Sequence, residues 1–578
     1  MNYLAKRLTA VIVAAASYTM NVAYADAPAQ TRDAQSKPSN PPVSGTRGAK
    51  TGTKPAPAAT PGVQDNATKL PKLLVTGKVL ADDPEAYNVT HSSLANKTDT
   101  PVMETPFSIQ TVPQQVIKDQ QVVRIERALQ NVSGVFQNNS TFLESADEFN
   151  IRGFRSGGVL FRDGMRFDTT AQGKRDPANL ERIEVLKGPA SFLFGRIEPG
   201  GLINLSTKQP LDTPYYSFAQ QFGSFDFYRT TLDATGPITA DNRFGYRANL
   251  AYENAGSFRE FVNHERTFVA PKFQWNLAPS TKITISLDHL QQWGHPDSVG
   301  LVALGNRPAP IPRGRNLGES WSTFKFASDI VVETLTHEFN EQWKVQQVFN
   351  YNSSDSTNNV VFGDISGFPP DPIQNGLLPR FPGGIDNNQN FGYYNALNLI
   401  GKFDTWELKH NVLIGGDFFY NKSTESIQGV LNDGFTPCQS IAPIDIFNPV
   451  HTGLAPPDFF DSSLGCDKQV FNNRTSWYGL YLQDQVELPF NIFLLGGFRY
   501  DNAQFNTSSL LANTPADLHQ TKLTPRGGVL WRPVQWLSFY GSYAQSLGST
   551  NVGSITTSGQ PIAPETAEQW EGGIKTEL

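Results

Sequence analysis

The stretch from Asn150 to Pro210 decides the fold of this chain, and it reads NIRGFRSGGVLFRDGMRFDTTAQGKRDPANLERIEVLKGPASFLFGRIEPGGLINLSTKQP. Glycine and proline recur in it between short apolar runs, which is typical of tight turns that link short strands in a small compact unit. Arg152 and Arg182 each lie next to an isoleucine of such a run. We expect at least one of them to be half buried and to need a carboxylate partner, because an unpaired buried charge is costly. The stretch therefore predicts a packing partner outside itself.

No catalytic pattern accompanies this stretch. The segment 195–202 (GRIEPGGL) lacks the Lys-Ser/Thr pair that follows the last glycine of a phosphate-binding loop, and Glu198 would repel a phosphate. Neither a Gly-x-Ser-x-Gly elbow nor a His-Glu-x-x-His pair occurs, and the eight histidines are scattered. We therefore expect no enzyme activity and no metal site, and the net charge of −7 gives no reason to expect a nucleic-acid partner.

The segment before this stretch predicts a strand, a helix and a turn. TPFSIQTVPQQVI (105–117) begins as a strand, and apolar residues near helical spacing over 114–129 predict a helix that breaks around Asp119 and Gln120. ALQNVSGV (128–135) then turns the chain back. Arg124 and its neighbouring cations alternate with acids, which favours a solvated or packed helix face over a nucleic-acid-binding one.

Several motifs follow in a fixed order: IRGF at 151–154, DG at 163–164, ERIEVLKGPAS at 181–191 and the glycine-rich segment 195–204. Together with the segment before them, they closely resemble the plug domain of TonB-dependent outer-membrane receptors, the siderophore receptors in particular, over residues 98–210. A glycine-rich hairpin unit of a soluble protein is the alternative interpretation.

After Pro210 the sequence alternates with a period of two, which is typical of strands. Between 244 and 253 the even positions are mostly apolar or aromatic, whereas Arg247, Asn249 and Glu253 lie on the other face. The mean hydropathy is −0.36, and no run of about 18 apolar residues follows the N-terminus, which argues against helical membrane spans. Aromatic-capped apolar strips favour a lipid-facing strand over a soluble sandwich. We predict a mainly β protein, with an N-terminal α+β plug domain inside a large antiparallel transmembrane β-barrel over 211–578.

The N-terminal residues predict export. Residues 1–25 combine Lys6 and Arg7, an apolar run and an Ala-Tyr-Ala cleavage site, which is typical of a signal peptide, although a retained anchor is the alternative. Residues 26–69 are rich in Pro, Ala, Gly, Thr and Ser and predict a flexible linker. Export into an oxidising compartment favours a disulfide between Cys438 and Cys466 over metal binding, which would need more ligands.

Residues 70–79 (LPKLLVTGKV) form a short β-prone segment beside this linker, able to add as a strand to another protein's sheet edge. The resemblance implies that its residues Leu73, Leu74, Val75, Thr76 and Gly77 are the TonB box, which the energy-coupling protein TonB grips. A first strand of the plug domain is the alternative. No folded signalling domain is predicted before it, so the chain resembles a transporter without that module.

The length after Pro210 allows roughly 14 or 15 strands, whereas plugged transporter barrels have about 22. An open sheet edge in hydrocarbon is costly. The chain stops at Glu577-Leu578 without a terminal aromatic residue, and 564–575 resembles an interior barrel strand. We therefore expect a C-terminally truncated chain or the product of a disrupted gene, which leaves a non-functional remnant as an alternative. Long polar stretches at 291–320, 352–390 and 421–474 predict extracellular loops.

The resemblance also implies the site residues. Arg152 and Arg182 would latch the plug to barrel carboxylates, with Glu571 the candidate here and a second one beyond Leu578; ion pairs within the plug, to Glu181, Glu184 or Asp163, are the alternative. The ligand is expected at outward plug loops and inward aromatics, and the residues predicted to contact it are Phe142, Arg155, Gly158, Phe167 and Gln172.

These features predict an outer-membrane receptor, expected to be a monomer in the lipid of the Gram-negative outer membrane, that takes up a ferric siderophore by TonB-dependent active transport. The siderophore saturates the coordination of its iron, so no cofactor bound by the protein is expected. A receptor for haem, cobalamin or another scarce nutrient is the alternative within transporters. A passive porin or a barrel enzyme would have no use for a plug and an energy-coupling segment.

Overall fold

The computed structural model describes residues 86–138, 147–156, 159–168, 173–363, 373, 375–428, 441–454, 469–509, 516–548, 551–555, 561–562 and 564–577, all within the compact unit Leu80–Leu578. The predicted signal peptide, linker and TonB box, and both cysteines, lie outside these residues. Among the described residues, no helix is long and apolar enough to cross a membrane.

The plug domain is built on a five-stranded sheet in the order β3-β9-β10-β7-β8. Its strands are β3 (Ile109–Pro113), β9 (Leu180–Lys187), β10 (Gly201–Thr207), β7 (Val159–Arg162) and β8 (Met165–Asp168). Only the β10–β7 pair is parallel. A second sheet joins β4 (Val135–Gln137), β5 (Phe149–Ile151) and β6 (Phe154–Arg155), and the short helices are α2 (Gln114–Asp119), α3 (Ile125–Leu129) and α4 (Ser191–Phe194). The predicted helix break at 119–120 is confirmed.

Tight turns hold these short strands together, as the glycine pattern predicts. Ile151 pairs directly with Phe154, so Arg152 and Gly153 form a two-residue hairpin loop, and both have positive φ (51° and 87°). Asp163 and Gly164 do the same between β7 and β8, with φ of 50° and 78°. Two consecutive positive φ angles are the signature of the type I′ turn, which matches the twist of the flanking strands.

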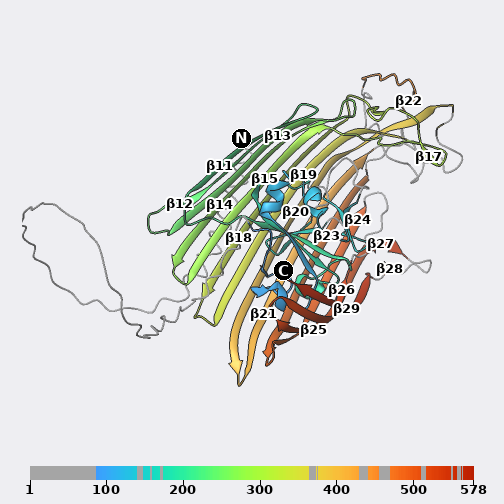
Figure 1. Ribbon diagram of the computed structural model, residues 1–578. Coiled ribbons are helices and arrows are strands. Elements are labelled where there is room, and N and C mark those ends of the chain that lie inside the picture. The colour runs from blue at the N-terminus through green and yellow to red at the C-terminus, as the bar shows by residue number, and fades with distance from the viewer. Residues whose placement is uncertain are drawn as a thin grey trace, which may run out of the picture. The chain divides into compact units, whose positions relative to one another are not determined.

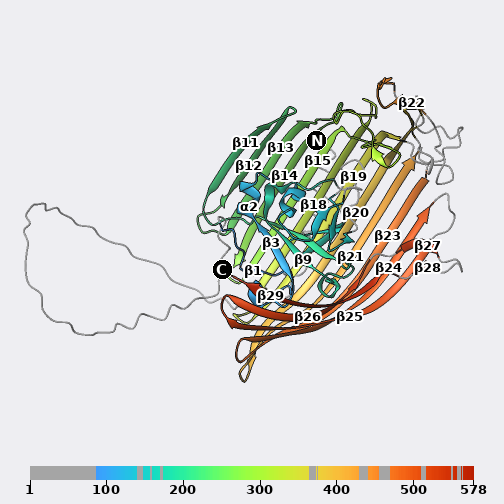
Figure 2. The same cartoon turned by 45° about the vertical axis from the view of Figure 1, so that its right-hand side comes forward.

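The residues after 210 form one large antiparallel sheet, confirming the predicted count of roughly 14 or 15 strands. Fourteen of its described strands follow one another in sequence order, from β11 to β29 (Figures 1 and 2). They are β11 (Tyr215–Gly223), β12 (Phe227–Pro237), β13 (Phe244–Gly256), β14 (Asn263–Ala278), β15 (Thr281–His295), β18 (Thr323–Glu338), β19 (Trp343–Gly363), β20 (Leu377–Thr405), β21 (Leu408–Gln428), β23 (Gln469–Leu488), β24 (Ile492–Ser509), β25 (Ala516–Val534), β26 (Leu537–Leu547) and β29 (Thr566–Thr576).

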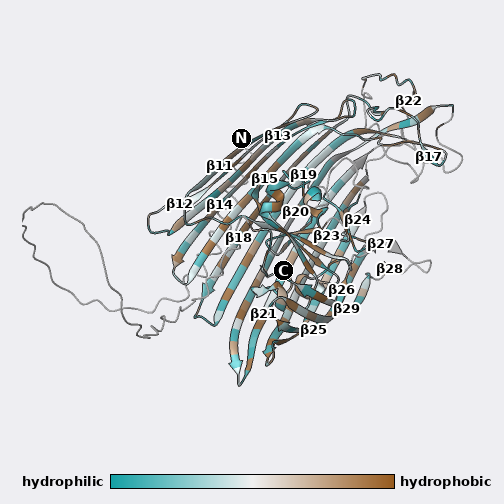
Figure 3. Cartoon of the chain, in the orientation of Figure 1, coloured by the Kyte–Doolittle hydropathy of each residue, from teal (hydrophilic) through white to brown (hydrophobic). Residues whose placement is uncertain are grey.

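The two faces of this sheet differ, which Figure 3 shows as bands of alternating colour along the strands. On β13, Arg247, Asn249 and Glu253 are buried, whereas Phe244 and Leu250 are exposed. On β23, Leu480 and Leu482 are exposed and Gln483 is fully buried. Polar side chains therefore face the plug and apolar ones face away, as the period of two predicts.

Several predicted loops are partly strand. β19 runs on to Gly363 and β20 begins at Leu377, so most of 352–390 pairs in the sheet. β21 runs on to Gln428 and β23 begins at Gln469, so the two ends of 421–474 pair in it as well. Their polar composition reads as loop because strand signals rest on apolar alternation. The β21–β23 connection carries β22 (Ile441–Asp445), and the β15–β18 connection carries β16 (Ala303–Leu304) and β17 (Arg307–Pro308). A small core around Leu317, Leu378 and Ile444 joins these two connections to the start of β20.

One glycine is required by close approach. A Cβ built on Gly479 of β23 would lie 1.9 Å from Nη2 of Arg499. Arg499 is fully buried and donates to Asp417 at 2.8 and 2.7 Å and to Asp501 at 2.7 Å.

We expect Gly479→Ala to push this guanidinium away from its carboxylates and to lower the free energy of unfolding by about 1–3 kcal/mol. Denaturant unfolding in detergent, followed by tryptophan fluorescence, measures the change. Gly496→Ala is the matched control, because its Cβ would meet nothing within 4 Å. Equal effects of the two substitutions would contradict the argument.

Candidate functional site

The plug domain packs against the polar face of the large sheet, and both views in Figures 1 and 2 place its strands inside the curve of that sheet. Charged side chains from the two sides meet there in buried ion pairs. These pairs join the plug directly to the strands of the large sheet. We therefore treat this interface as the candidate functional site.

Arg152 reaches the sheet from the tip of the β5–β6 hairpin. Its Nη1 lies 2.7 Å from Oε2 of Glu571 on β29, and the Arg152 side chain is 35% exposed. Glu571 also accepts hydrogen bonds from the Tyr540 hydroxyl and from Gln569, each at 2.6 Å. The two residues predicted as a latch are thus in contact, and their role in holding the plug stays a prediction.

Arg182 forms ion pairs within the plug, as the alternative interpretation of the sequence expects. Its Nε lies 3.3 Å from Glu184, and its Nη1 lies 3.7 Å from Glu181, so these ion pairs are within the plug. Glu184 is buried and also accepts hydrogen bonds from Ser92 at 2.7 Å and Asn204 at 2.8 Å. These contacts support the plug sheet itself.

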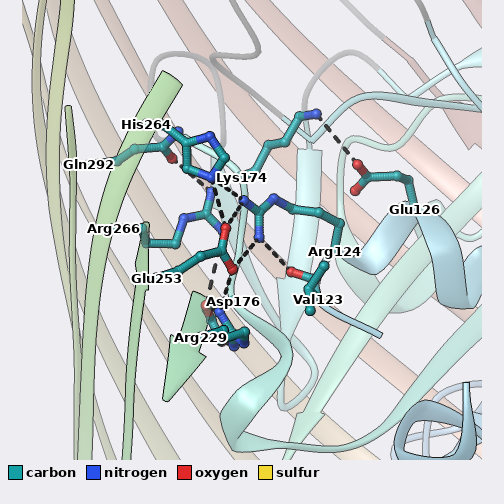
Figure 4. A network of polar contacts seen from close by, with 10 residues as sticks. All are labelled: Val123, Arg124, Glu126, Lys174, Asp176, Arg229, Glu253, His264, Arg266 and Gln292. Carbon is teal, nitrogen blue, oxygen red and sulfur yellow. Dashed lines mark hydrogen bonds and ion pairs between the residues drawn. The ribbon is translucent and has the colours of Figure 1, made fainter. Parts of the chain in front are cut away.

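A larger network, which sequence reasoning missed, surrounds Glu253 of β13 (Figure 4). Arg124, at the start of α3, donates to both carboxylate oxygens of Glu253, and Arg229 of β12 donates to the same carboxylate at 2.8 Å. Arg229 also donates to Asp176 of the plug at 2.9 and 2.6 Å. Charges from the plug and the sheet therefore alternate in one chain, from Arg124 through Glu253 and Arg229 to Asp176.

Two further contacts complete this network. His264 lies 2.8 Å from Glu253, and Arg266, which is almost fully buried, donates to Gln292 at 2.7 Å. The sequence signal for the site was the set of charged residues on the polar face of alternating strands. Because side chains on that face cannot reach bulk water once a plug covers them, each needs a partner.

Two other plug residues meet acids of the sheet. Lys208 lies 2.9 Å from Asp233 of β12, which also receives two hydrogen bonds from Arg247 at 2.9 and 2.8 Å. Arg162 of β7 donates to Asp288 of β15 at 2.9 Å, and the plug's Asn179 donates to the same oxygen at 3.1 Å.

We name residues 88–107, which precede the plug sheet, the strap. Side chains of the barrel donate hydrogen bonds to its backbone carbonyls. Arg526 donates to Ala95 at 2.6 Å, and Gln483 donates to Asn96 at 3.2 Å. Lys575 of β29 donates to three carbonyls, those of Val102, Thr105 and Phe107, at 2.8, 2.6 and 2.9 Å. The strap therefore follows the inner wall of the sheet before the chain enters β3.

The residues predicted to contact a ligand do not gather in the described structure. Arg155 has a 61% exposed side chain and pairs with Glu148. Phe167 is fully buried in the plug core, under the Arg175 guanidinium at 5.3 Å, so its side chain packs the plug rather than lining a surface. Phe142, Gly158 and Gln172 lie outside the described residues. No group of three or more His, Cys, Asp or Glu side chains in the described part could hold a metal ion.

Two family models match this chain. The TonB-dependent receptor plug domain matches residues 101–202, and the β-barrel of TonB-dependent receptor-like proteins matches residues 284–578. The chain therefore belongs to the TonB-dependent receptors, a family of outer-membrane receptors and transporters, and the large sheet is its barrel.

Particular relatives narrow this class. The chain is 29% identical over 532 residues to the metal-pseudopaline receptor CntO of Pseudomonas aeruginosa (strain UCBPP-PA14), covering 89% of this chain and 71% of that protein. It is 26% identical over 511 residues to the ferrichrome outer membrane transporter/phage receptor of Escherichia coli (strain K12), covering 84% of this chain and 66% of that protein. The crystal structure of the siderophore receptor PiuA from Acinetobacter baumannii shares the fold, with a TM-score of 0.75, 21% identity, and coverage of 86% and 73% of the two chains.

The partly buried Lys97 of the strap should make the docking of the strap depend on pH. Its ammonium group donates to the Tyr481 hydroxyl at 3.0 Å and lies between the Tyr481 and Phe194 rings, at 4.4 and 5.4 Å from their centroids. Burial lowers the pKa of Lys97 to about 7, against a partial opposing effect of Asp417. Because the released strap would have an ordinary lysine pKa near 10.4, protonation favours the released state between pH 7 and about 10.

We therefore expect the strap to bind the barrel more firmly as the pH rises from 7 to 9, by at most about 1.4 kcal/mol per pH unit. Hydrogen exchange of strap amides, corrected for the intrinsic effect of pH, measures this. Lys97→Met should flatten the dependence, whereas Lys118→Met, at an exposed position of α2, should leave it unchanged. A dependence that survives Lys97→Met would contradict the assignment.

Proposed function

We propose that this protein is an outer-membrane receptor for the TonB-dependent active uptake of a ferric siderophore. The observation that carries the proposal is the plug, which packs against the polar face of the barrel sheet through ion pairs. The names of the relatives agree with this ligand class, since they include receptors for ferrichrome, ferrioxamine B and pseudopaline-bound metal. The Leu73–Gly77 segment would be the handle that TonB pulls.

Uptake requires the plug to rearrange. The ion pairs are arranged so that plug movement leaves few barrel carboxylates without a hydrogen-bond donor. Three barrel acids that contact plug cations each keep a donor from the barrel: Glu253 keeps Arg229, Asp233 keeps Arg247, and Glu571 keeps Tyr540 and Gln569. Leaving a buried charge unpaired costs about 3–5 kcal/mol. These retained donors lower the cost of plug movement while the docked state stays specific.

Asp288 differs from these three acids. The hydrogen bonds it accepts among the described residues come from Arg162 and Asn179, both in the plug. Moving both β7 and the turn that carries Asn179 away from the barrel would therefore leave this carboxylate without these two donors. We infer that the contact of Arg162 and Asn179 with Asp288 is the last of these interfaces to open.

A pair of substitutions tests whether retained donors govern release. Arg152→Met should loosen the plug, because the docked state loses an ion pair. Tyr540→Phe should tighten it by about 1 kcal/mol, because Glu571 then depends more on Arg152. Hydrogen exchange of plug amides in graded urea, with the chain in detergent, compares the two variants. If Tyr540→Phe loosens the plug as much as Arg152→Met, the retained-donor argument fails.

The transport proposal has its own test. Deleting Leu73–Gly77 should abolish energy-dependent uptake of a labelled ferric siderophore by cells and leave its binding to the cell surface unchanged. The control is deletion of five residues within the linker at 26–69. Undiminished uptake after the first deletion would show that the handle lies elsewhere.

A further inference from the structure

A polar group interrupts the apolar outward face of the barrel on β18, β19 and β20, which are neighbours in the sheet (Figure 1). Glu333 and Asn395 are both register partners of Phe349, so these three residues share one face. Ile285, the register partner of Glu333 on β15, is 42% exposed, because this face is turned away from the plug. Gln347 lies two positions before Phe349 and therefore on the same face. We name Glu333, Gln347 and Asn395 the outward polar group.

Aromatic residues place this group within the hydrocarbon layer. On β19, Trp343 and Tyr351 lie four positions to either side of Gln347 and on the same face. The Trp343 ring stacks on Phe403. Tyr351 is the register partner of Tyr393, whose ring stacks on a tyrosine of β21. Such rings mark the two boundaries of the apolar band, and the strand between them covers about 27 Å, or about 20 Å of height at a tilt near 40°. Gln347 therefore lies near the middle of the membrane.

The hydrogen-bonding capacity of this group is only partly satisfied. Nε2 of Gln347 donates to Oδ1 of Asn395 at 3.2 Å, and Gln347 also hydrogen-bonds Glu333. Among the described residues, Nδ2 of Asn395 has no acceptor, and both amide side chains are partly exposed. Glu333 is 4% exposed, and its Oε1 has no hydrogen-bond partner in the same part of the chain. Because hydrocarbon supplies no hydrogen bonds, such groups call for polar partners from another molecule within the membrane.

Other strands carry apolar residues at the corresponding outward positions. These are Ala248 and Leu250 on β13, and Ile414 and Gly416 on β21. An outward asparagine of β24, Asn502, has a partner, since its Oδ1 lies 3.1 Å from Nε2 of His519. The amides of β19 and β20 are thus a local departure from the lipid-facing surface of the barrel.

We propose that the outward face of β19 and β20 is the contact surface between two copies of this chain in the outer membrane. Copies of one membrane protein share one orientation, so a symmetric pair has its two-fold axis along the membrane normal. Each residue near this axis then meets its own equivalent at the same height. Such a contact needs groups that pair with themselves, and a primary amide does so because it carries two donors and an acceptor with two lone pairs.

The residues around the amides suit the same contact. Leu397, the register partner of Gln347, is 56% exposed. Its own register partner on β21 is Gly416, and small residues let membrane-spanning elements approach closely. A dimer departs from the monomer expected from the sequence, because the separate patterns of β19 and β20 do not show that their amides meet.

The dissociation constant of the pair, measured in lipid bilayers by energy transfer between labelled copies, tests the proposal. We expect Gln347→Leu and Asn395→Leu each to raise this constant about fivefold, given the usual contribution of an amide hydrogen bond inside a membrane. Leucine suits a lipid-facing position, so both variants should keep the barrel folded. Asn502→Leu is the matched control, because it removes an outward amide of β24 that already has a partner.

Cross-linking in the outer membrane of cells locates the contact. A short thiol-reactive cross-linker should join two copies of Leu397→Cys, whereas Leu523→Cys, on β25 and 58% exposed, should stay uncoupled. The unaltered chain, with Cys438 and Cys466, gives the baseline. Both measurements are made without siderophore or TonB, so their outcome is independent of the transport proposal.

Four results would each overturn the dimer. They are an unchanged dissociation constant in the Gln347→Leu, Asn395→Leu double variant, an equal change with Asn502→Leu, no cross-linked dimer of Leu397→Cys, and a cross-link from this position to a protein of different mass.

Discussion

A buried charge needs a partner, and the structure depends on this constraint more than on any other. The barrel turns its charged and amide side chains toward the plug, where water is excluded, and its apolar side chains toward lipid. The plug therefore cannot be an inert filler. It has to bring Arg124, Arg162 and Asp176 to places where the barrel already carries Glu253, Asp288 and Arg229.

Apolar packing contributes to the same interface in a different way. One core cluster joins plug residues such as Ile125 and Phe149 with barrel residues such as Phe419 and Trp477. Such contacts add stability without fixing a register, because they are not directional. Ion pairs and the carbonyl contacts of the strap supply the direction, since a hydrogen bond weakens steeply when its geometry changes. Specific docking and reversible release then follow from one set of polar contacts.

Prediction from the sequence succeeded where the signal was local. The Arg152-Gly153 turn, the helix break after Asp119 and the alternating faces of the barrel strands each follow from a few neighbouring residues. It failed at Phe167, where an expected outward residue is buried in the plug core. An aromatic residue next to a turn suits either place, and only the packing of α3 and the sheet around it distinguishes the two.

The sequence by itself determined the order of elements, the plug and barrel halves, and which face of each strand is polar. Only the tertiary structure decided which charges meet. Arg152 pairs with a residue 419 positions away, and Arg124 with one 129 positions away. Such pairs depend on strand register and on how the plug is seated, and both arise from the sum of many weak contacts over the whole chain. A local pattern can show that a charge needs a partner, but the choice of partner belongs to the fold.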